Sequence, residues 1–256
     1  MAGGTWKTGI SRVEPNKILI RGYDVNELMG RLNFAEAVYL LWAGGGPSPE
    51  VGRLVNAIMI SSMDHGATPP SVLAARTVAS CGAPLGSAIA AGILALSKYH
   101  GAAIEDCRRM LDRVLERVEG GASLETAADA ELDELASRGE RAPGLGHRLH
   151  TRDPRVERLF ELCAACAVPG RHIAALQGLA KALDRRGKAL PINVDGAIAA
   201  CLAEIEFPLG LSNALFILAR AAGIAVQAHE EQMRERPMRP IDPAAYEYDG
   251  IGERRL

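Results

Sequence analysis

Three of the six histidines stand in segments where an imidazole could do chemistry. Asp64-His65-Gly66 and Tyr99-His100-Gly101 each predict the close of a helix, and His147 follows the glycine-rich stretch 143–146. An imidazole gains and loses a proton near neutral pH, which suits general acid–base catalysis. Taken singly, each is more often a helix-end histidine stabilised by the helix dipole. Three in such settings together indicate a functional site.

Asp195 lies at the start of a predicted helix. Asp195 follows the apolar segment Leu190–Ile192 and precedes the alanine-rich helix Ala197–Ala203. As a helix cap it would satisfy backbone N–H groups without any chemistry. A partly buried acid at a helix start can also transfer protons, because desolvation opposes the dipole and raises the pKa of the carboxyl.

Arg220 is the anomalous arginine of the sequence. It lies in an apolar helix between Phe216 and Ile224, and the neighbouring sequence supplies no obvious acid. An unpaired buried charge costs several kcal/mol, so a bidentate ligand carboxylate is a sensible partner. Three other arginines stand where ion pairs with surface acids are the default expectation: Arg155, Arg236 and Arg239.

The sequence predicts neither a metal site nor a nucleotide loop. No HExxH or His-x-His spacing occurs, and the pair Cys163 and Cys166 lacks a second pair to complete four zinc ligands. We interpret that pair as helix core. Gly44-Gly45-Gly46 is followed by Pro47 instead of the Lys-Ser/Thr ending of a phosphate-binding loop. A metal-dependent hydrolase that uses Asp64 and His65 is a distant alternative.

The elements that must position these residues are helical. An alternating piece at 17–21 predicts one strand of a small hairpin with its turn at 14–16, and the rest predicts an all-α fold. Asp24, Asn33 and Ser48 are predicted N-caps. The uncharged run Thr77–Ser97 predicts a pair of buried, small-residue helices, and the acidic segment Glu125–Arg138 predicts a solvated helix face. The expected helices are 25–31, 34–42, 50–63, 104–118, 156–163 and 211–233.

Composition limits the classes of function. With 256 residues, 48% of them hydrophobic, the chain can bury a sizeable core, and a formal net charge of −2 predicts neither nucleic-acid nor membrane binding. We expect one unit over 1–256, with a small helical subdomain within 150–190 compatible with it. Five cysteines in apolar or helical surroundings and a start without an apolar signal core lead us to expect a reducing cytoplasm.

The order of motifs resembles the citrate synthase superfamily, above all its short members, citryl-CoA lyase and the C-terminal citryl-CoA-cleaving module of ATP-citrate lyase. The residues that carry the resemblance are Ile20–Asp24, Phe34–Leu41, Asp64–Gly66, His100-Gly101, Pro143–His147, Asp153–Arg155, Asn193–Gly196, Leu218–Arg220, Ala228–Gln232 and Arg239-Pro240. The resemblance implies a compact, multi-helical citrate-synthase-like fold with a short N-terminal β-hairpin.

The resemblance also implies roles for individual residues. His147 would polarise the keto or hydroxyl oxygen of the oxaloacetate half, Asp195 would move the proton on the methyl carbon of acetyl-CoA, and His100 would hydrogen-bond the thioester oxygen. The resemblance further implies two sets of binding residues. The residues implied to hold the dicarboxylate are His65, Arg155, Arg220 and, from a partner subunit, Arg239. The residues implied to lie against coenzyme A are Gly144, Leu145 and Gly146.

We therefore predict a citryl-CoA lyase-like enzyme that cleaves citryl-CoA, or a close 3-hydroxy-3-carboxyacyl-CoA, to acetyl-CoA and oxaloacetate. Two alternatives remain: a compact citrate synthase, and a non-catalytic acyl-CoA-binding subunit of a larger complex. The resemblance implies a homodimer or higher homo-oligomer and no permanently bound cofactor, the coenzyme A thioester being substrate. The sequence contains no ATP-dependent half, so a citryl-CoA synthetase is a candidate partner.

Overall fold

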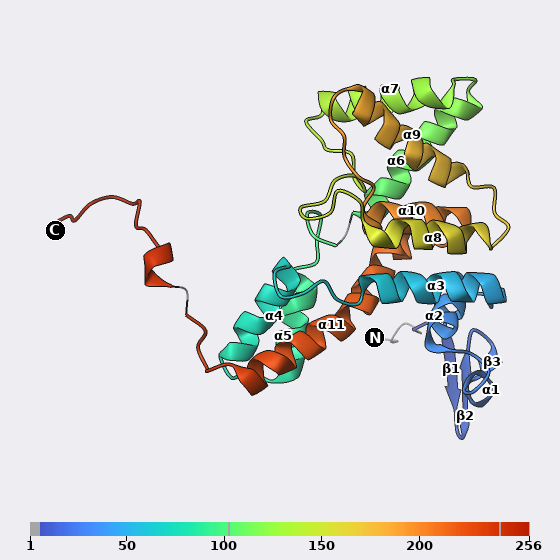
Figure 1. Ribbon diagram of the computed structural model, residues 1–256. Coiled ribbons are helices and arrows are strands. Elements are labelled where there is room, and N and C mark those ends of the chain that lie inside the picture. The colour runs from blue at the N-terminus through green and yellow to red at the C-terminus, as the bar shows by residue number, and fades with distance from the viewer. Residues whose placement is uncertain (1–5, 102, 241, 256) are drawn as a thin grey trace, which may run out of the picture.

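The computed structural model describes residues 6–101, 103–240 and 242–255, and these form a helical body with a small sheet near the N-terminus (Figure 1). The strands are β1 (Ser11–Glu14), β2 (Lys17–Ile20) and β3 (Tyr23–Asp24). The α-helices are α1 (Val25–Leu28), α2 (Phe34–Ala43), α3 (Pro49–Ser62), α4 (Pro70–Ser80), α5 (Leu85–Leu94), α6 (Ile104–Glu119), α7 (Leu124–Ser137), α8 (Pro154–Ala164), α9 (Arg171–Arg185), α10 (Val194–Glu204) and α11 (Ser212–Arg234). Two short 3-10 helices are η1 (Leu209–Leu211) and η2 (Pro243–Ala245).

The predicted hairpin is present and gains a third strand. β1 and β2 pair antiparallel with Glu14 opposite Lys17, and the turn between them holds Asn16 at a φ of 60°. Asparagine tolerates this left-handed conformation better than most residues, because its side chain can hydrogen-bond locally. β3 then pairs with the other edge of β2.

Side-chain caps begin the helices where the sequence predicted them. The Asp24 carboxylate accepts from the Asn26 N–H, and the Ser48 hydroxyl accepts from the Val51 N–H. Asn33 and Glu36 form a reciprocal capping box at the start of α2. The first helix ends at Leu28 instead of Arg31, because the chain turns at Gly30 with a φ of 88°.

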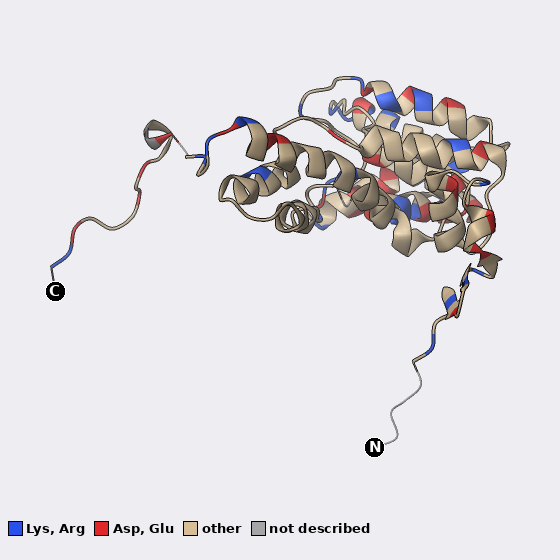
Figure 2. Ribbon diagram, turned by 90° about the horizontal axis from the view of Figure 1, so that it is seen from below, with Lys and Arg blue, Asp and Glu red and all other residues tan. Residues whose placement is uncertain are grey.

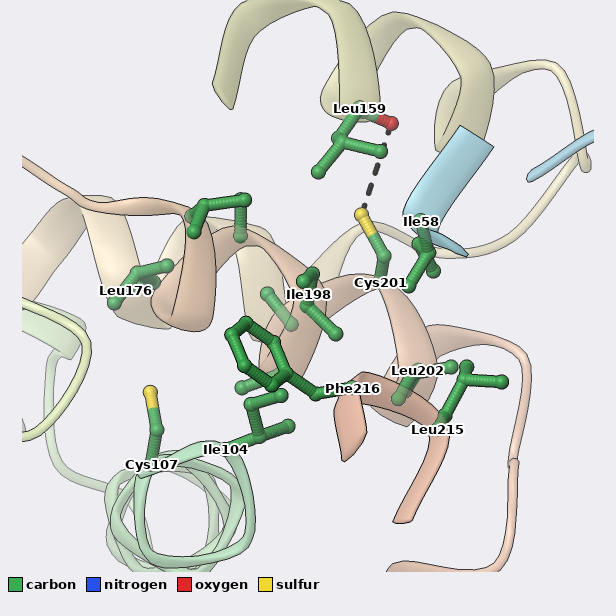
Figure 3. Close-up of a cluster of buried hydrophobic side chains, with 14 of the residues drawn as sticks. Ile58, Ile104, Cys107, Leu159, Leu176, Ile198, Cys201, Leu202, Leu215 and Phe216 are labelled. Carbon is green, nitrogen blue, oxygen red and sulfur yellow. Dashed lines mark hydrogen bonds between the residues drawn. The ribbon is translucent and has the colours of Figure 1, made fainter. Parts of the chain in front are cut away.

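Helix α10 is the centre of the body. Every residue of it is buried except Asp195, which is half-buried, and it packs on α3, α6, α8 and α9 (Figure 1). Figure 3 shows Ile198 and Leu202 of α10 among side chains from the helices around them, including Leu176 of α9 and Phe216 of α11. Its many small residues permit this close approach of helices on several sides. A helix buried all round holds a polar residue at its end in a fixed place.

Helix α11 joins the helices packed around α10, which form one part of the body, to the pair α4 and α5, which form the other. It packs on α3 near one end and lies against the paired helices α4 and α5 near the other (Figure 1). By length and composition alone, the stretch Leu209–Arg234 could cross a membrane, a test that core helices of soluble proteins also pass. Its buried face includes Leu215, Phe216 and Ile224, as predicted for a core helix.

Two sequence predictions need correction. The helix pair predicted in Thr77–Ser97 exists as α4 and α5, but α5 ends at Leu94, so His100 lies in a loop instead of closing a helix. The acidic segment forms α7, yet Glu131 is fully buried, because the guanidinium groups of Arg113 and Arg117 neutralise it.

The small subdomain expected within 150–190 stays a prediction. In that segment α8 packs on α3 and α10, whereas α9 packs on α6, α7 and α10.

Among the described residues the surface has no large region of one charge sign, and the C-terminal segment lies apart from the body (Figures 1 and 2). Acidic and basic residues are interspersed over the helical body instead of separated by sign (Figure 2). The segment after α11 extends away from the body in both views (Figures 1 and 2). It carries the exposed apolar side chains of Tyr246, Tyr248 and Ile251.

Candidate active site

A cavity of about 900 Å³ lies where the two parts of the body meet α11. Its walls come from the loops after α3 and α5, the loop before α8, the first turn of α10 and the middle of α11. Six residues singled out in the sequence for catalysis or dicarboxylate binding line it: His65, His100, His147, Arg155, Asp195 and Arg220. Side chains separated by up to 155 positions therefore face one space.

The carboxyl end of α3 holds two of the arginines that line the cavity, Arg155 and Arg220. The Arg155 Nη1 donates to the Ser61 carbonyl at 3.1 Å, and the Arg220 Nε donates to the Ser62 carbonyl at 2.6 Å. The last carbonyl groups of a helix lack helical partners and carry partial negative charge, so they suit guanidinium donors. His65 follows three residues later in the chain.

Close backbone packing fixes the position of α11 against this end of α3. A Cβ built on Gly223 would stand 2.1 Å from the Met63 carbonyl oxygen, which is nearer than any real contact. Only glycine permits α11 to approach so closely. This approach brings Arg220 within reach of Ser62.

Arg220 is a buried cation that pairs with no carboxylate of the described residues. It is 3% exposed, its guanidinium lies 4.8 Å from the Phe216 ring centre, and its Nε donates to the Ser62 carbonyl. Cation–π contact and one carbonyl compensate only part of the cost of burying the charge. Arg220 thus lacks a carboxylate partner among the described residues, as its sequence neighbours predicted.

The loop that carries His147 is fastened to the start of α10. The Asn193 amide donates to the Gly146 carbonyl at 2.8 Å, and the Asn193 N–H donates to the Gly144 carbonyl at 3.1 Å. Gly144 packs directly on Gly196, where a Cβ would meet the Gly144 oxygen at 2.4 Å. His147 and Asp195 thus keep a fixed mutual position.

Backbone groups set the tautomer of His147. Its Nδ1 accepts from the N–H groups of Leu149 and His150, each at 3.0 Å. In the neutral ring the proton must then be on Nε2, which makes that atom a hydrogen-bond donor. Burial and the nearby cationic side chains lower the pKa of His147, so the ring is neutral at physiological pH.

His100 is also held as a neutral imidazole. Its Nε2 lies 2.8 Å from the hydroxyl oxygen of the fully buried Ser71. Burial, with smaller contributions from Arg220 and Arg148, lowers the pKa of His100 to about 4. With Nε2 occupied by Ser71, Nδ1 is the nitrogen left to meet a ligand.

Asp195 stands in the first turn of α10 but does not cap it. The cap is Asn193, whose side chain accepts from the Gly196 N–H, so the capping interpretation of Asp195 is wrong. Burial raises the pKa of Asp195 to about 6, although Arg155 and Arg220 oppose the rise. A carboxyl that titrates near 6 can both take and give a proton at neutral pH.

The structure also gathers three histidines that the sequence argument did not connect. Ring nitrogens of His65, His147 and His150 lie within 4.8 Å of one another, from two separate loops. Spacing within one segment could not have revealed this cluster. Three imidazoles can hold a metal ion, but a metal-bound histidine normally donates from its second nitrogen, whereas the second nitrogen of His147 accepts. The geometry therefore favours hydrogen bonding to a ligand oxygen.

Comparisons with known proteins identify the family of this chain. The family model for the citrate synthase C-terminal domain matches residues 43–241. The chain belongs to the citrate synthase family. A relative from Mycobacterium tuberculosis that carries the name citrate synthase 2 is 29% identical over 204 residues, which cover 77% of this chain and 52% of the relative. The chain thus spans about half the length of the curated relatives it matches.

Two solved structures show how far the likeness extends. The citryl-CoA lyase from Hydrogenobacter thermophilus is 36% identical, with a TM-score of 0.87, covering 98% of this chain and 97% of that one. The ATP citrate lyase of Methanosaeta concilii, solved with (3S)-citryl-CoA, has a TM-score of 0.83 at 19% identity, covering 99% of this chain and 43% of that one. The latter supports the fold alone.

Gly144 and Arg239, to which the resemblance assigns binding roles, do not line the cavity of their own chain. Gly144 lies beneath the wall, against Gly196 and Cys107, while Leu145 and Gly146 do line it. Arg239 lies elsewhere, where its guanidinium donates to both carboxylate oxygens of Glu231 at 2.6 Å. Within its own subunit, Arg239 is therefore a partner of Glu231.

Sequence reasoning missed the basic residues of the other cavity wall. Arg141, Arg186 and Lys188 line it together with apolar side chains of α7 and α9. Arg186 is paired with Asp129 and Asp133, whereas Arg141 and Lys188 form no ion pair with the described residues. The citrate synthase fold brings these residues together from three loops and helix ends, so no local motif could have identified them.

Proposed function

We propose that this protein is a citryl-CoA lyase that cleaves citryl-CoA, or a close 3-hydroxy-3-carboxyacyl-CoA, to acetyl-CoA and oxaloacetate. One observation carries the proposal. A single cavity holds a titratable acid, Asp195, opposite two neutral imidazoles, His100 and His147, beside two guanidinium groups. The 36% identity to a citryl-CoA lyase over nearly all of both chains supports the lyase assignment.

The dicarboxylate half binds at the carboxyl end of α3. Arg220 offers its two terminal nitrogens, which bond to no other side chain or carbonyl of the described residues, and Arg155 adds a second guanidinium held by Ser61. Bidentate guanidinium–carboxylate pairs give both affinity and orientation. His65, on the loop directly after α3, completes this end of the site as a further donor to the dicarboxylate.

His147 acts on the oxygen of the carbon whose bond to the acetyl half breaks. Its Nε2–H donates a hydrogen bond to that oxygen during cleavage, while the citryl hydroxyl loses its proton to solvent and becomes the carbonyl of oxaloacetate. In condensation the same N–H stabilises the developing negative charge until the oxygen takes up a proton from solvent. The two backbone N–H donors on Nδ1 keep the ring proton on Nε2, and the charges of Arg148 and Arg155 nearby favour the neutral ring.

Asp195 and His100 act on the acetyl half. When the carbon–carbon bond breaks, its electron pair moves into the thioester and gives an enolate. His100 donates a hydrogen bond to the enolate oxygen, and the protonated Asp195 delivers its proton to the methylene carbon, which becomes the methyl group of acetyl-CoA. A neutral imidazole with its pKa near 4 is a donor without a full charge of its own.

The coenzyme A portion lies along the opposite wall. Leu145 and Gly146 contact the pantetheine or nucleotide, and Arg141 and Lys188 meet its phosphates. Lysine and arginine side chains that are not held in an ion pair are suitable phosphate partners. The substrate is thus a coenzyme A thioester, and no permanently bound cofactor is needed for these steps.

The protein works as a homodimer or higher homo-oligomer in the cytoplasm. Arg239 reaches the dicarboxylate site of a partner subunit, in keeping with its position outside the cavity of its own chain. All five cysteines are free, which suits a reducing compartment. A citryl-CoA synthetase would supply the substrate.

Two reactions separate the lyase from its main rival. The pure protein is given citryl-CoA in one assay, and acetyl-CoA with oxaloacetate in the other, while free thiol and oxaloacetate are followed. A lyase releases oxaloacetate from citryl-CoA without releasing thiol. Rapid thiol release in both assays identifies a compact citrate synthase, the second candidate, which the family match of residues 43–241 favours. Ligand binding without turnover in either assay identifies a non-catalytic acyl-CoA-binding subunit.

A further inference from the structure

Asp153 holds together two parts of the site without lining the cavity. It is 2% exposed and begins α8, where its carboxylate accepts four hydrogen bonds. Oδ1 accepts from the backbone N–H of Arg155 at 3.1 Å and from its Nε at 2.8 Å. Oδ2 accepts from the Arg155 Nη2 at 2.7 Å and from the backbone N–H of Val194 at 3.2 Å.

The hydrogen bond from the Val194 N–H connects the Asp153–Arg155 ion pair to the residue that transfers the proton, Asp195. Val194 is the first residue of α10, and Asp195 follows it directly. The Asp153 carboxylate therefore bridges the Arg155 guanidinium, which contacts the dicarboxylate, and the first turn of α10, which carries Asp195. With Ser61 holding Nη1 from the other side, Arg155 has little freedom to turn.

We propose that Asp153 is a positioning residue, which fixes the Arg155 guanidinium beside the Asp195 carboxyl so that dicarboxylate binding and proton transfer share one geometry. It acts through these two residues and does not touch the reacting atoms. The inference rests on the proposed function of Arg155 and Asp195. A residue that only capped α8 would accept from the Arg155 N–H and would need none of the other three hydrogen bonds.

The charges around Asp195 make the proposal measurable. The charged and titratable groups that influence it are Arg155 and Asp153 at the start of α8, Arg220 on α11 and the Cys107 thiol on α6. Burial raises the pKa of Asp195, Arg155 and Arg220 lower it, and Asp153 raises it. If Asp153 holds Arg155 in place, its replacement frees the guanidinium from Asp195, and the pKa of Asp195 rises because Arg155 lowers it more than Asp153 raises it. Loss of the Asp153 charge alone, with Arg155 still in place, would lower that pKa.

Two variants remove the charge and keep the cap. Asp153→Asn and Asp153→Ser both retain a side-chain oxygen that accepts from the Arg155 N–H. Asp24→Asn is the matched control, because Asp24 caps α1 with the same bond to the N–H two residues on and lies outside the cavity. The readouts are the carbon-13 NMR titration of the Asp195 carboxyl, identified by the signal missing from Asp195→Asn, and calorimetry with oxaloacetate.

In both Asp153 variants the Asp195 midpoint should rise above about 6, and oxaloacetate affinity should fall about tenfold. The Asp24→Asn protein should show neither change. An Asp195 midpoint that stays at about 6 or falls in either folded variant overturns the proposal and leaves Asp153 as an ordinary helix cap. The titration needs no turnover, so a failure to cleave citryl-CoA would count against the proposed function alone.

Discussion

The proton affinity of Asp195 makes both activity and stability depend on pH. Burial raises its folded-state pKa to about 6, above the ordinary 3.8, so the folded protein binds this proton more tightly than the unfolded chain does. The resulting stabilisation is complete below pH 3.8 and is lost as the pH rises through about 6. At pH 8 the ionised, buried carboxylate is a cost that the folded protein carries.

Asp195→Asn should therefore abolish turnover and stabilise the fold at pH 8. The amide keeps the shape but neither accepts nor delivers the proton, and it removes the buried charge, which is worth about 2 kcal/mol in the free energy of unfolding. Urea unfolding at pH 5 and pH 8 measures the difference, which should shrink at the lower pH. An equal effect at both values, or near wild-type turnover, would contradict this account.

Arg220→Met should weaken oxaloacetate binding at least tenfold and change coenzyme A binding little. The guanidinium has no carboxylate partner among the described residues, so a ligand carboxylate is the group that loses a contact. Calorimetry with each ligand separately measures the two affinities. Equal losses for both ligands, or lower stability with unchanged binding, would indicate a purely structural role for the arginine.

At the scale of elements, the site depends on how closely α11 approaches the end of α3. Gly223→Ala should separate the two helices, because its Cβ would stand 2.1 Å from the Met63 carbonyl oxygen. We expect a loss of about 1–3 kcal/mol in the free energy of unfolding and a weaker affinity for oxaloacetate, since Arg220 is drawn away from Ser62.

Gly86→Ala is the control for the helix itself. Gly86 also lies in a helix, α5, but a Cβ there meets no atom within 4 Å, so alanine should leave the protein equally or slightly more stable. Urea unfolding and oxaloacetate calorimetry on both variants test the argument. Wild-type oxaloacetate affinity in Gly223→Ala would show that this contact does not position Arg220.

At the scale of the whole molecule, the site should be completed by a second chain. Arg239 is bound by Glu231 in its own subunit and lies outside its own cavity, so we predict that it acts in the partner. Co-folding an Asp195→Ala chain with an Arg239→Ala chain produces mixed dimers in which one site has both native residues. About a quarter of wild-type activity should return, because half of the dimers are mixed and one of two sites in each is intact.

Each variant alone should be nearly inactive. If Arg239 acted within its own subunit, every site in the mixture would carry one defect and no activity would return. That result would exclude a shared site. Activity of Arg239→Ala alone at the wild-type level would make this arginine a structural partner of Glu231 only.

Local features were predictable from the sequence. The hairpin turn at Asn16 and the caps Asp24, Asn33 and Ser48 lie where expected, because each depends on residues within four positions of itself. The order of motifs predicted the family and, through it, the six residues that meet in the cavity. The apolar neighbours of Arg220 in the sequence were enough to predict that it is buried without a carboxylate partner nearby.

Only the tertiary structure decided how those residues are held. The carbonyls of Ser61 and Ser62 bind the two arginines, and Asp153 joins Arg155 to the start of α10, through contacts that no spacing along the chain encodes. The cap of α10 is Asn193 because the preceding loop pairs with the Gly144–Gly146 segment and so sets where the helix begins. Sequence patterns determine what each segment can form by itself, whereas the proton affinity of Asp195 depends on burial and on charges brought from α8 and α11 by folding.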